Sequence, residues 1–189
     1  MTLLLIGLAV FIGAHSLRIV APGWREARIS AWGVNAWKAV AGILSIAGFV
    51  LILYGYGEAR QAPVLLWTPP AGLRHAAALL TLPAFILLVA AYVPRSWPKL
   101  QLGHPMVLAV KLWALAHLLM VGWLHSIVLF GSLLLWSILS FRTARRREPP
   151  SRASASAASS LLAVVIGTAA WAGFALYLHA RWIGVAPFG

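Results

Sequence analysis

Two ionisable side chains interrupt an apolar run between residues 103 and 122. Lys111 and His117 lie inside this run, and His104 stands before a proline at its start. An ionisable group at membrane depth costs about 3 kcal/mol or more, so such groups usually face a protein interior or a cavity and mark function. The run is therefore the strongest candidate for a functional site.

Helical geometry divides these residues between two faces. His104 and Lys111 are seven residues apart and share a face, whereas His117 lies about 140° further around the axis and about 20 Å along it. The two histidines cannot bind one small metal ion together. His104 and Lys111 are a candidate polar edge for an anionic group, and His117 is a candidate metal ligand whose alternative is an interhelical hydrogen bond.

The other histidines differ in their depth within the chain's apolar runs. His15 lies inside the first run and is the second candidate ligand, although a buried histidine can also simply hydrogen-bond between helices. His75, which follows Arg74, is left open as a cofactor-binding residue. His125 and His179 fall at predicted helix ends, where we expect them to hydrate or cap the helix. Lys111 has an alternative too, because its long side chain can snorkel to the interface.

Composition limits the chemistry that these residues can perform. The chain has no Cys, which excludes thiolate iron–sulfur clusters and covalent haem attachment, and its three acidic residues, all Glu, are far apart. A neutral intramembrane imidazole is compatible with axial ligation of haem b, whose apolar ring suits a helix bundle. The two propionates need cations, and Lys111, Arg18 and Arg74 are available near or within the apolar runs.

The elements that must position these residues are predicted to be membrane-spanning helices. The 189 residues are 62% apolar and only 10% charged, which is a membrane composition. Six apolar runs have spanning length, at about 1.5 Å rise per residue: 2–20, 39–56, 75–93, 105–122, 126–141 and 160–179. We predict an all-α, polytopic membrane helix bundle of about six transmembrane helices, in one domain over 1–189 with a linker at 142–159.

The basic residues indicate how this bundle is oriented. With the first, third and fifth connections in the cytoplasm, eleven Lys and Arg residues lie on that side and three on the other, with Lys111 within a span. This distribution accounts for the net charge of +12 without nucleic acid, and it predicts periplasmic termini. The first run is read as a retained helix, and residues 21–38, rich in Trp and Arg, as a surface-lying amphipathic segment in contact with membrane lipid.

Several strings in the chain are similar to those of one protein family. They are GAHSLR at 13–18, WTPP at 67–70, RH at 74–75, AYVP at 91–94, GHPM at 103–106, KLWA at 111–114, AHLL at 116–119 and WIGV at 182–185. Through them the chain resembles, over essentially its whole length, the NnrU family of bacterial integral membrane proteins. The resemblance implies a multi-pass protein of the bacterial inner membrane, linked to nitric oxide and denitrification.

A relative of that family, the plant and cyanobacterial zeta-carotene isomerase, uses haem b with two histidine ligands. The resemblance implies that His117, in its Ala-His-x-Leu string, is one ligand of the haem iron. An ungapped match puts the second ligand at Phe11, and His15 lies one helical turn further on, on the same face. The expected pair is therefore His15 and His117, and His104 is the alternative partner for His15.

Three functions follow as hypotheses. The first is a haem-b-binding membrane protein in nitric oxide or redox physiology, and the second is a haem-dependent cis–trans isomerase of a carotenoid or isoprenoid polyene. The third is a non-enzymatic scaffold or accessory subunit whose histidines only join helices. The His-Pro string also resembles the cofactor region of membrane methyltransferases, but Gly103 stands where those proteins have Arg and the later Glu pair is missing.

Overall fold

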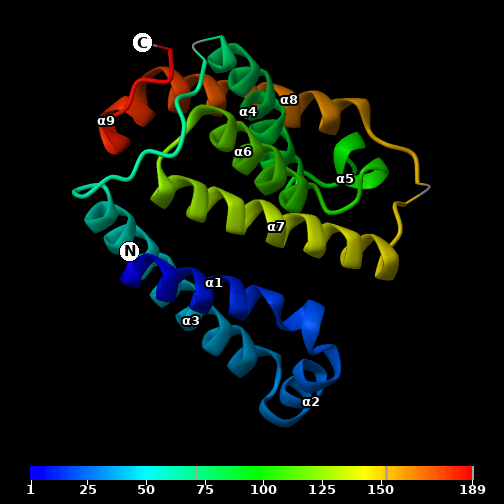
Figure 1. The fold of residues 1–189 in the computed structure, drawn as a ribbon. Helices are drawn as coiled ribbons and strands as arrows, with labels where there is room; N and C mark the ends of the chain where they lie inside the picture. The colour runs from blue at the N-terminus through cyan, green and yellow to red at the C-terminus, as the bar shows by residue number, and fades with distance from the viewer. Residues whose placement is uncertain (71, 152, 189) are drawn as a thin grey trace. The chain divides into compact units, whose positions relative to one another are not determined.

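The computed structural model describes residues 1–70, 72–151 and 153–188, and the named elements within them are helical (Figure 1). They are α1 (Thr2–Val20), α2 (Pro22–Trp32), α3 (Val34–Ala59), α4 (Leu73–Ala90), α5 (Trp97–Gln101), α6 (Pro105–Met120), α7 (Leu124–Arg147), α8 (Ala157–Gly173), the π-helical turn η1 (Phe174–Leu178) and α9 (His179–Ile183). The all-α class expected from the sequence is confirmed.

Five helical segments are long and apolar enough to cross a membrane. They are α1, α3, α4, α7 and the continuous stretch from α8 to α9, each with a mean hydropathy of 1.8 or more. The chain is therefore that of a multi-pass membrane protein. The fourth expected span, α6, is apolar but only 16 residues long, so the number six stays a prediction. Residues 142–147, expected in the linker, continue α7 as a helix.

The chain divides into two compact units, which are described separately. Unit 1 comprises Met1–Thr68 with Gly122–Ser140, and unit 2 comprises Pro69–Val121 with Phe141–Gly189. Arg152, one of the residues in the charge count, lies outside the described residues. The division runs through α7, whose first part belongs to unit 1 and whose last turns belong to unit 2.

In unit 1, α1 and α3 lie side by side (Figure 1). Glycines allow their backbones to approach closely, as is common between membrane helices. A Cβ atom added at Gly7 would lie 2.6 Å from the backbone nitrogen of Ile52, and one at Gly48 would lie 2.7 Å from that of Phe11. Gly55 is equally constrained by Leu4.

Backbone hydrogen bonds in unit 1 join the segment after α3 to the start of α7. Leu66 N–H donates to the Gly122 carbonyl and Leu124 N–H donates to that of Val64, both at 2.8 Å. A side chain at Gly122 would overlap the Trp67 carbonyl. Nearby, the hydroxyls of Tyr56 and Ser126 are hydrogen-bonded at 2.9 Å. These contacts fix residues 64–66 beside 122–124.

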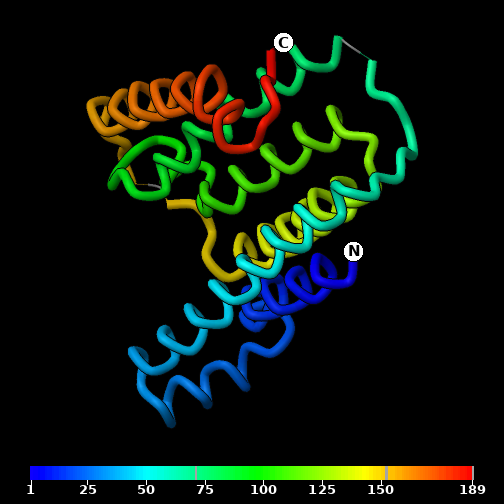
Figure 2. Tube along the Cα trace, turned by 90° about the vertical axis from the view of Figure 1, so that its left-hand side faces the viewer, coloured from blue at the N-terminus to red at the C-terminus, as the bar shows by residue number. Residues whose placement is uncertain are grey.

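In unit 2, α4 packs against both α6 and α8. A Cβ atom at Gly167 of α8 would lie 2.6 Å from Cα of Ile86 in α4, so these helices also meet at a glycine. Beyond α9 the chain reverses at Gly184, which has a φ of +78°, and Figure 2 shows the C-terminal segment turning back after this helix. This reversal brings Phe188 against Trp171 of α8, with ring centroids 6.1 Å apart.

Two connecting segments of unit 2 also lie together. Ser151 N–H donates to the Leu100 carbonyl at 3.0 Å, and Ser156 N–H donates to that of Arg95 at 2.9 Å. Arg145 Nη1 donates to the Leu102 carbonyl at 2.7 Å. The α4–α6 connection is thus bound to the segment between α7 and α8.

Candidate functional site

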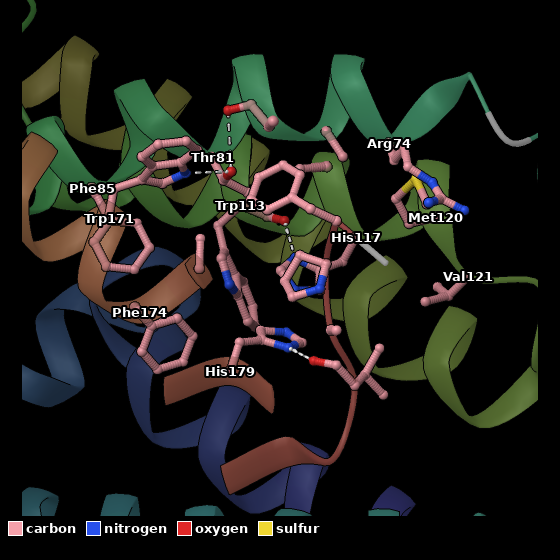
Figure 3. Close-up of a pocket in the computed structure, with 18 residues that line it drawn as sticks. Arg74, Thr81, Phe85, Trp113, His117, Met120, Val121, Trp171, Phe174 and His179 are labelled. Carbon is pink, nitrogen blue, oxygen red and sulfur yellow. Dashed lines mark hydrogen bonds between the residues drawn. The ribbon is translucent and has the colours of Figure 1, made fainter. Parts of the chain in front are cut away.

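A pocket opens in unit 2 between α4, α6, η1 and the C-terminal segment (Figure 3). Its walls are largely apolar and aromatic, and two histidines, one threonine and one arginine supply its polar side chains. The lining includes Arg74 and Thr81 from α4, Trp113 and His117 from α6, Trp171 from α8, Phe174 from η1 and His179 from α9. Because α4 packs against both α6 and α8, it positions the pocket residues of these helices next to one another.

The sequence singled out His117, and the structure places it in this pocket. Its ring packs against Trp113, one turn earlier on α6, with centroids 4.7 Å apart. Its Nδ1 donates to the Trp113 carbonyl at 2.8 Å. Because a carbonyl only accepts, the proton is on Nδ1, and Nε2 carries the lone pair of the neutral ring.

His179 lines the same pocket and lies next to a segment that is not regular α-helix. It begins α9 directly after the π-helical turn η1, and such turns are frequent at functional sites. Its Nδ1 donates to the Val185 carbonyl at 2.6 Å. That carbonyl can reach back because Gly184 adopts a left-handed conformation, which glycine does without strain.

The rings of His117 and His179 lie with their centroids 6.4 Å apart and their planes inclined by 28°. Two nitrogens bound to one metal lie about 4 Å apart, twice a metal–nitrogen bond of about 2.0 Å. A centroid separation of 6.4 Å leaves room for a metal between the two rings if both Nε2 atoms turn toward it. In both rings Nδ1 is held by a backbone carbonyl, which is how metal-binding histidines are usually oriented.

The two imidazoles of this pocket are its candidate metal ligands. Among the described residues, no group of three or more His, Cys, Asp or Glu side chains could hold a metal ion. Two imidazoles alone leave a metal short of ligands, whereas a porphyrin supplies four more nitrogens. The two imidazoles are therefore compatible with haem iron.

The walls of the pocket have distinct ends. Figure 3 shows Phe85, Trp171 and Phe174 toward one end and Arg74 beside Met120 toward the other, with the two histidines between. At the aromatic end, Trp171 Nε1 donates to Thr81 Oγ1 at 3.0 Å, so these polar groups satisfy each other. The walls suit a flat apolar ligand with an anionic group at the Arg74 end.

The pocket has a volume of about 200 Å³. Ligand cavities usually have roughly 300–1,000 Å³, so a group as large as haem requires the walls to move apart. The wall without helical structure is the segment Val185–Phe188, which lines the pocket after the Gly184 turn. We expect this segment to move when a large ligand enters.

His15, the expected partner of His117, belongs to unit 1. It is exposed, its Nδ1 donates to the Phe11 carbonyl at 2.7 Å, and its ring lies 5.9 Å from that of Trp136. Arg18 is also in unit 1, in the last turn of α1. The pairing of His15 with His117 stays a prediction.

His104 and Lys111 both contact the segment that follows residue 140. His104 Nε2 donates to the Glu148 carbonyl at 3.2 Å, and Lys111 Nζ lies 6.0 Å from the Phe141 ring centroid. Neither lines the pocket with His117, nor does His75, which is exposed in the first turn of α4. The neighbouring Arg74 does line it.

Sequence reasoning missed His179, which was expected only to hydrate or cap a helix end. Its position depends on the π-helical turn before it and on the reversal at Gly184 after it, neither of which periodicity reveals. The available signal was the glycine shortly after the histidine, inside the WIGV string.

Comparison with known proteins assigns the chain to a family. No curated protein and no solved structure is significantly similar to the chain. The profile of a protein family described as NnrU protein matches residues 3–187, a range that includes every pocket residue named above except Phe188. Since this match covers nearly the whole chain, the protein belongs to the NnrU family.

Proposed function

We propose that this protein binds haem b in the pocket of unit 2, with His117 and His179 as the two iron ligands. The observation that carries the proposal is the pair of imidazoles 6.4 Å apart, each with Nδ1 held by a backbone carbonyl. The proposal keeps His117 in the role expected from the sequence and replaces His15 by His179 as its partner.

The other pocket residues have roles that follow from their chemistry. Trp113, Phe85 and Phe174 offer aromatic surface to the macrocycle, and the Arg74 guanidinium offers paired donors to a propionate. The Trp113 and Val185 carbonyls fix the orientation of the two imidazole rings and leave Nε2 of each ring available to the iron. When bound, haem would supply a redox-active iron, and it could bind nitric oxide only if one of the two histidines gave up its place on the iron.

We therefore infer a role in nitric oxide or redox physiology at the bacterial inner membrane, which is what the resemblance to the NnrU family implies. A second function, haem-dependent cis–trans isomerisation of a lipophilic polyene, is favoured by the apolar and aromatic pocket walls. The two functions differ in the second ligand of the site, which is nitric oxide for the first and a polyene for the isomerase. Bound pigment, or altered isomers in a carotenoid-producing host, would support the isomerase.

The test is to purify the full chain in detergent after haem-replete expression and to record pyridine haemochrome and reduced-minus-oxidised spectra. We expect bound haem b in the wild type, and its loss or a shifted Soret band in His117→Ala and His179→Ala. His75→Ala is the matched control, because His75 is exposed near the same pocket without lining it.

A fourth variant separates the two candidate pairs. If His15→Ala alters the spectrum and His179→Ala does not, the ligands are His15 and His117, and our assignment of His179 is wrong. A folded wild-type protein without haem would overturn the proposed function and favour a scaffold.

A further inference from the structure

A cluster of tryptophan and arginine side chains covers α2 in unit 1. This tryptophan–arginine patch consists of Trp24, Arg25, Arg28, Trp32 and Trp37. The helix α2 connects α1 to α3 through single residues at each end, and both neighbours are long and apolar enough to span a bilayer. The patch therefore lies where two spans leave the same side of the membrane, at the level of the lipid headgroups.

The patch is built around Trp37, which is only 9% exposed. The rings of Trp24 and Trp32 lie 6.0 Å and 6.4 Å from it. Both outer indoles are about half exposed, at 50% and 47%, so they can enter the interfacial region of a bilayer, which tryptophan favours.

Two guanidinium groups lie against these indole faces. Arg25 Cζ is 5.7 Å from the Trp37 ring centroid, and Arg28 Cζ is 5.9 Å and 5.8 Å from those of Trp24 and Trp32. Stacking holds the planar groups in place and leaves their N–H edges as donors.

One of these donors lacks an acceptor. Arg28 Nε is buried and has no hydrogen-bond partner within the part of the chain that the structure describes. A buried unsatisfied donor is costly, and because Nε itself is covered, a ligand from outside the protein would bind this guanidinium through its two Nη groups. The segment holds a single acidic residue, Glu26, against two arginines, and the acceptor should therefore be anionic.

We propose that the tryptophan–arginine patch binds the phosphate of an anionic phospholipid headgroup. Arg25 and Arg28 present paired N–H donors, which match phosphate oxygens, and Trp24 and Trp32 provide apolar contact with the adjoining acyl region. A lipid is the occupant because the patch adjoins two spans and exposes its indoles. The site is in unit 1 and does not depend on haem binding in unit 2.

The test uses native mass spectrometry of the full chain in detergent, titrated with phosphatidylglycerol or with phosphatidylcholine. We expect wild type to retain phosphatidylglycerol more strongly, and Arg25→Gln/Arg28→Gln to bind it roughly 30-fold more weakly, at about 1 kcal/mol per arginine near the lipid surface. Arg181→Gln, which removes an exposed arginine of α9, should leave the affinity unchanged.

Two further measurements distinguish a specific lipid site from general attraction of anions to positive charge. Arg28→Lys keeps the charge but loses the paired donors, so we expect an affinity between those of wild type and the double variant, in a protein that folds. Inorganic phosphate at the same concentration should not displace the lipid. Unchanged affinity in the double variant, equal retention of phosphatidylcholine, or displacement by inorganic phosphate would each overturn the proposal.

Discussion

His117 and His179 present a matched pair of imidazoles to one pocket, with ring centroids 6.4 Å apart. The carbonyl that orients His117 comes from its own helix, four residues earlier. The carbonyl that orients His179 comes from Val185, across a chain reversal. The His117 side is therefore rigid, and the geometry of the pair depends on the Gly184 turn.

The first prediction concerns Gly184, whose φ is +78°. Gly184→Ala should strain the turn by about 1–2 kcal/mol and displace the Val185 carbonyl from His179. We expect a lower midpoint of thermal unfolding, and in haem-loaded protein a shifted Soret band. Gly131→Ala is the control, since nothing lies within 4 Å of an added Cβ there and its φ is not positive. Equal behaviour of the two variants would contradict the role of the turn.

A second prediction concerns the charge at one end of the pocket. Arg74→Gln should weaken haem retention about tenfold, because one charge-assisted hydrogen bond contributes about 1.5 kcal/mol. Arg74→Lys keeps the charge and should retain more haem than Arg74→Gln. Haem transfer to apomyoglobin measures the retention, and the exposed neighbour His75→Ala is the control. Wild-type retention by Arg74→Gln would show that no propionate lies at Arg74.

The third prediction tests the packing of α1 against α3 in unit 1. Gly55→Ala should lower the free energy of unfolding by about 1–3 kcal/mol, because the added Cβ would meet the backbone of Leu4. Gly42→Ala, on the same helix and with open space around it, should be neutral or stabilising by up to about 1 kcal/mol. Unfolding in mixed detergent micelles measures both, and similar values would rule out close packing at Gly55.

Much of the fold follows from hydropathy alone. The predicted first span, 2–20, coincides with α1, because a long apolar run in lipid must satisfy its backbone as a helix. His117 could be singled out for the same reason, since ionisable groups within apolar helices are rare.

The remaining features of the site depend on contacts that the hydrophobic periodicity of the sequence does not predict. His179 reaches the pocket through a π-helical turn and a reversal at Gly184. Arg74 lines the pocket and His75 does not, because adjacent helical residues face about 100° apart. His104 has a positive φ of 24° beside Gly103, and its side chain is hydrogen-bonded to the distant Glu148 carbonyl.

The last prediction concerns whether α6 crosses the membrane. Leu66 is hydrogen-bonded to Gly122, so the chain between them must cross the bilayer an even number of times. That stretch contains α4, a candidate span, and α6. Leu100 is likewise bonded to Ser151, with α6 and the candidate span α7 between them. If α4 and α7 each cross once, both contacts require α6 to cross as well.

Six spans therefore place residues 101 and 151 on the same side, whereas five spans without α6 place them on opposite sides. Because the chain has no Cys, single Gln101→Cys and Ser151→Cys variants can be probed in intact cells with a membrane-impermeant maleimide. We expect both to be labelled only after permeabilisation, and Gln61→Cys, in the loop after α3, to be labelled without it. Labelling of Ser151→Cys but not Gln101→Cys in intact cells would show that α6 does not cross. Protection of Gln61→Cys with exposure of the other two would keep six spans and reverse the orientation inferred from the basic residues.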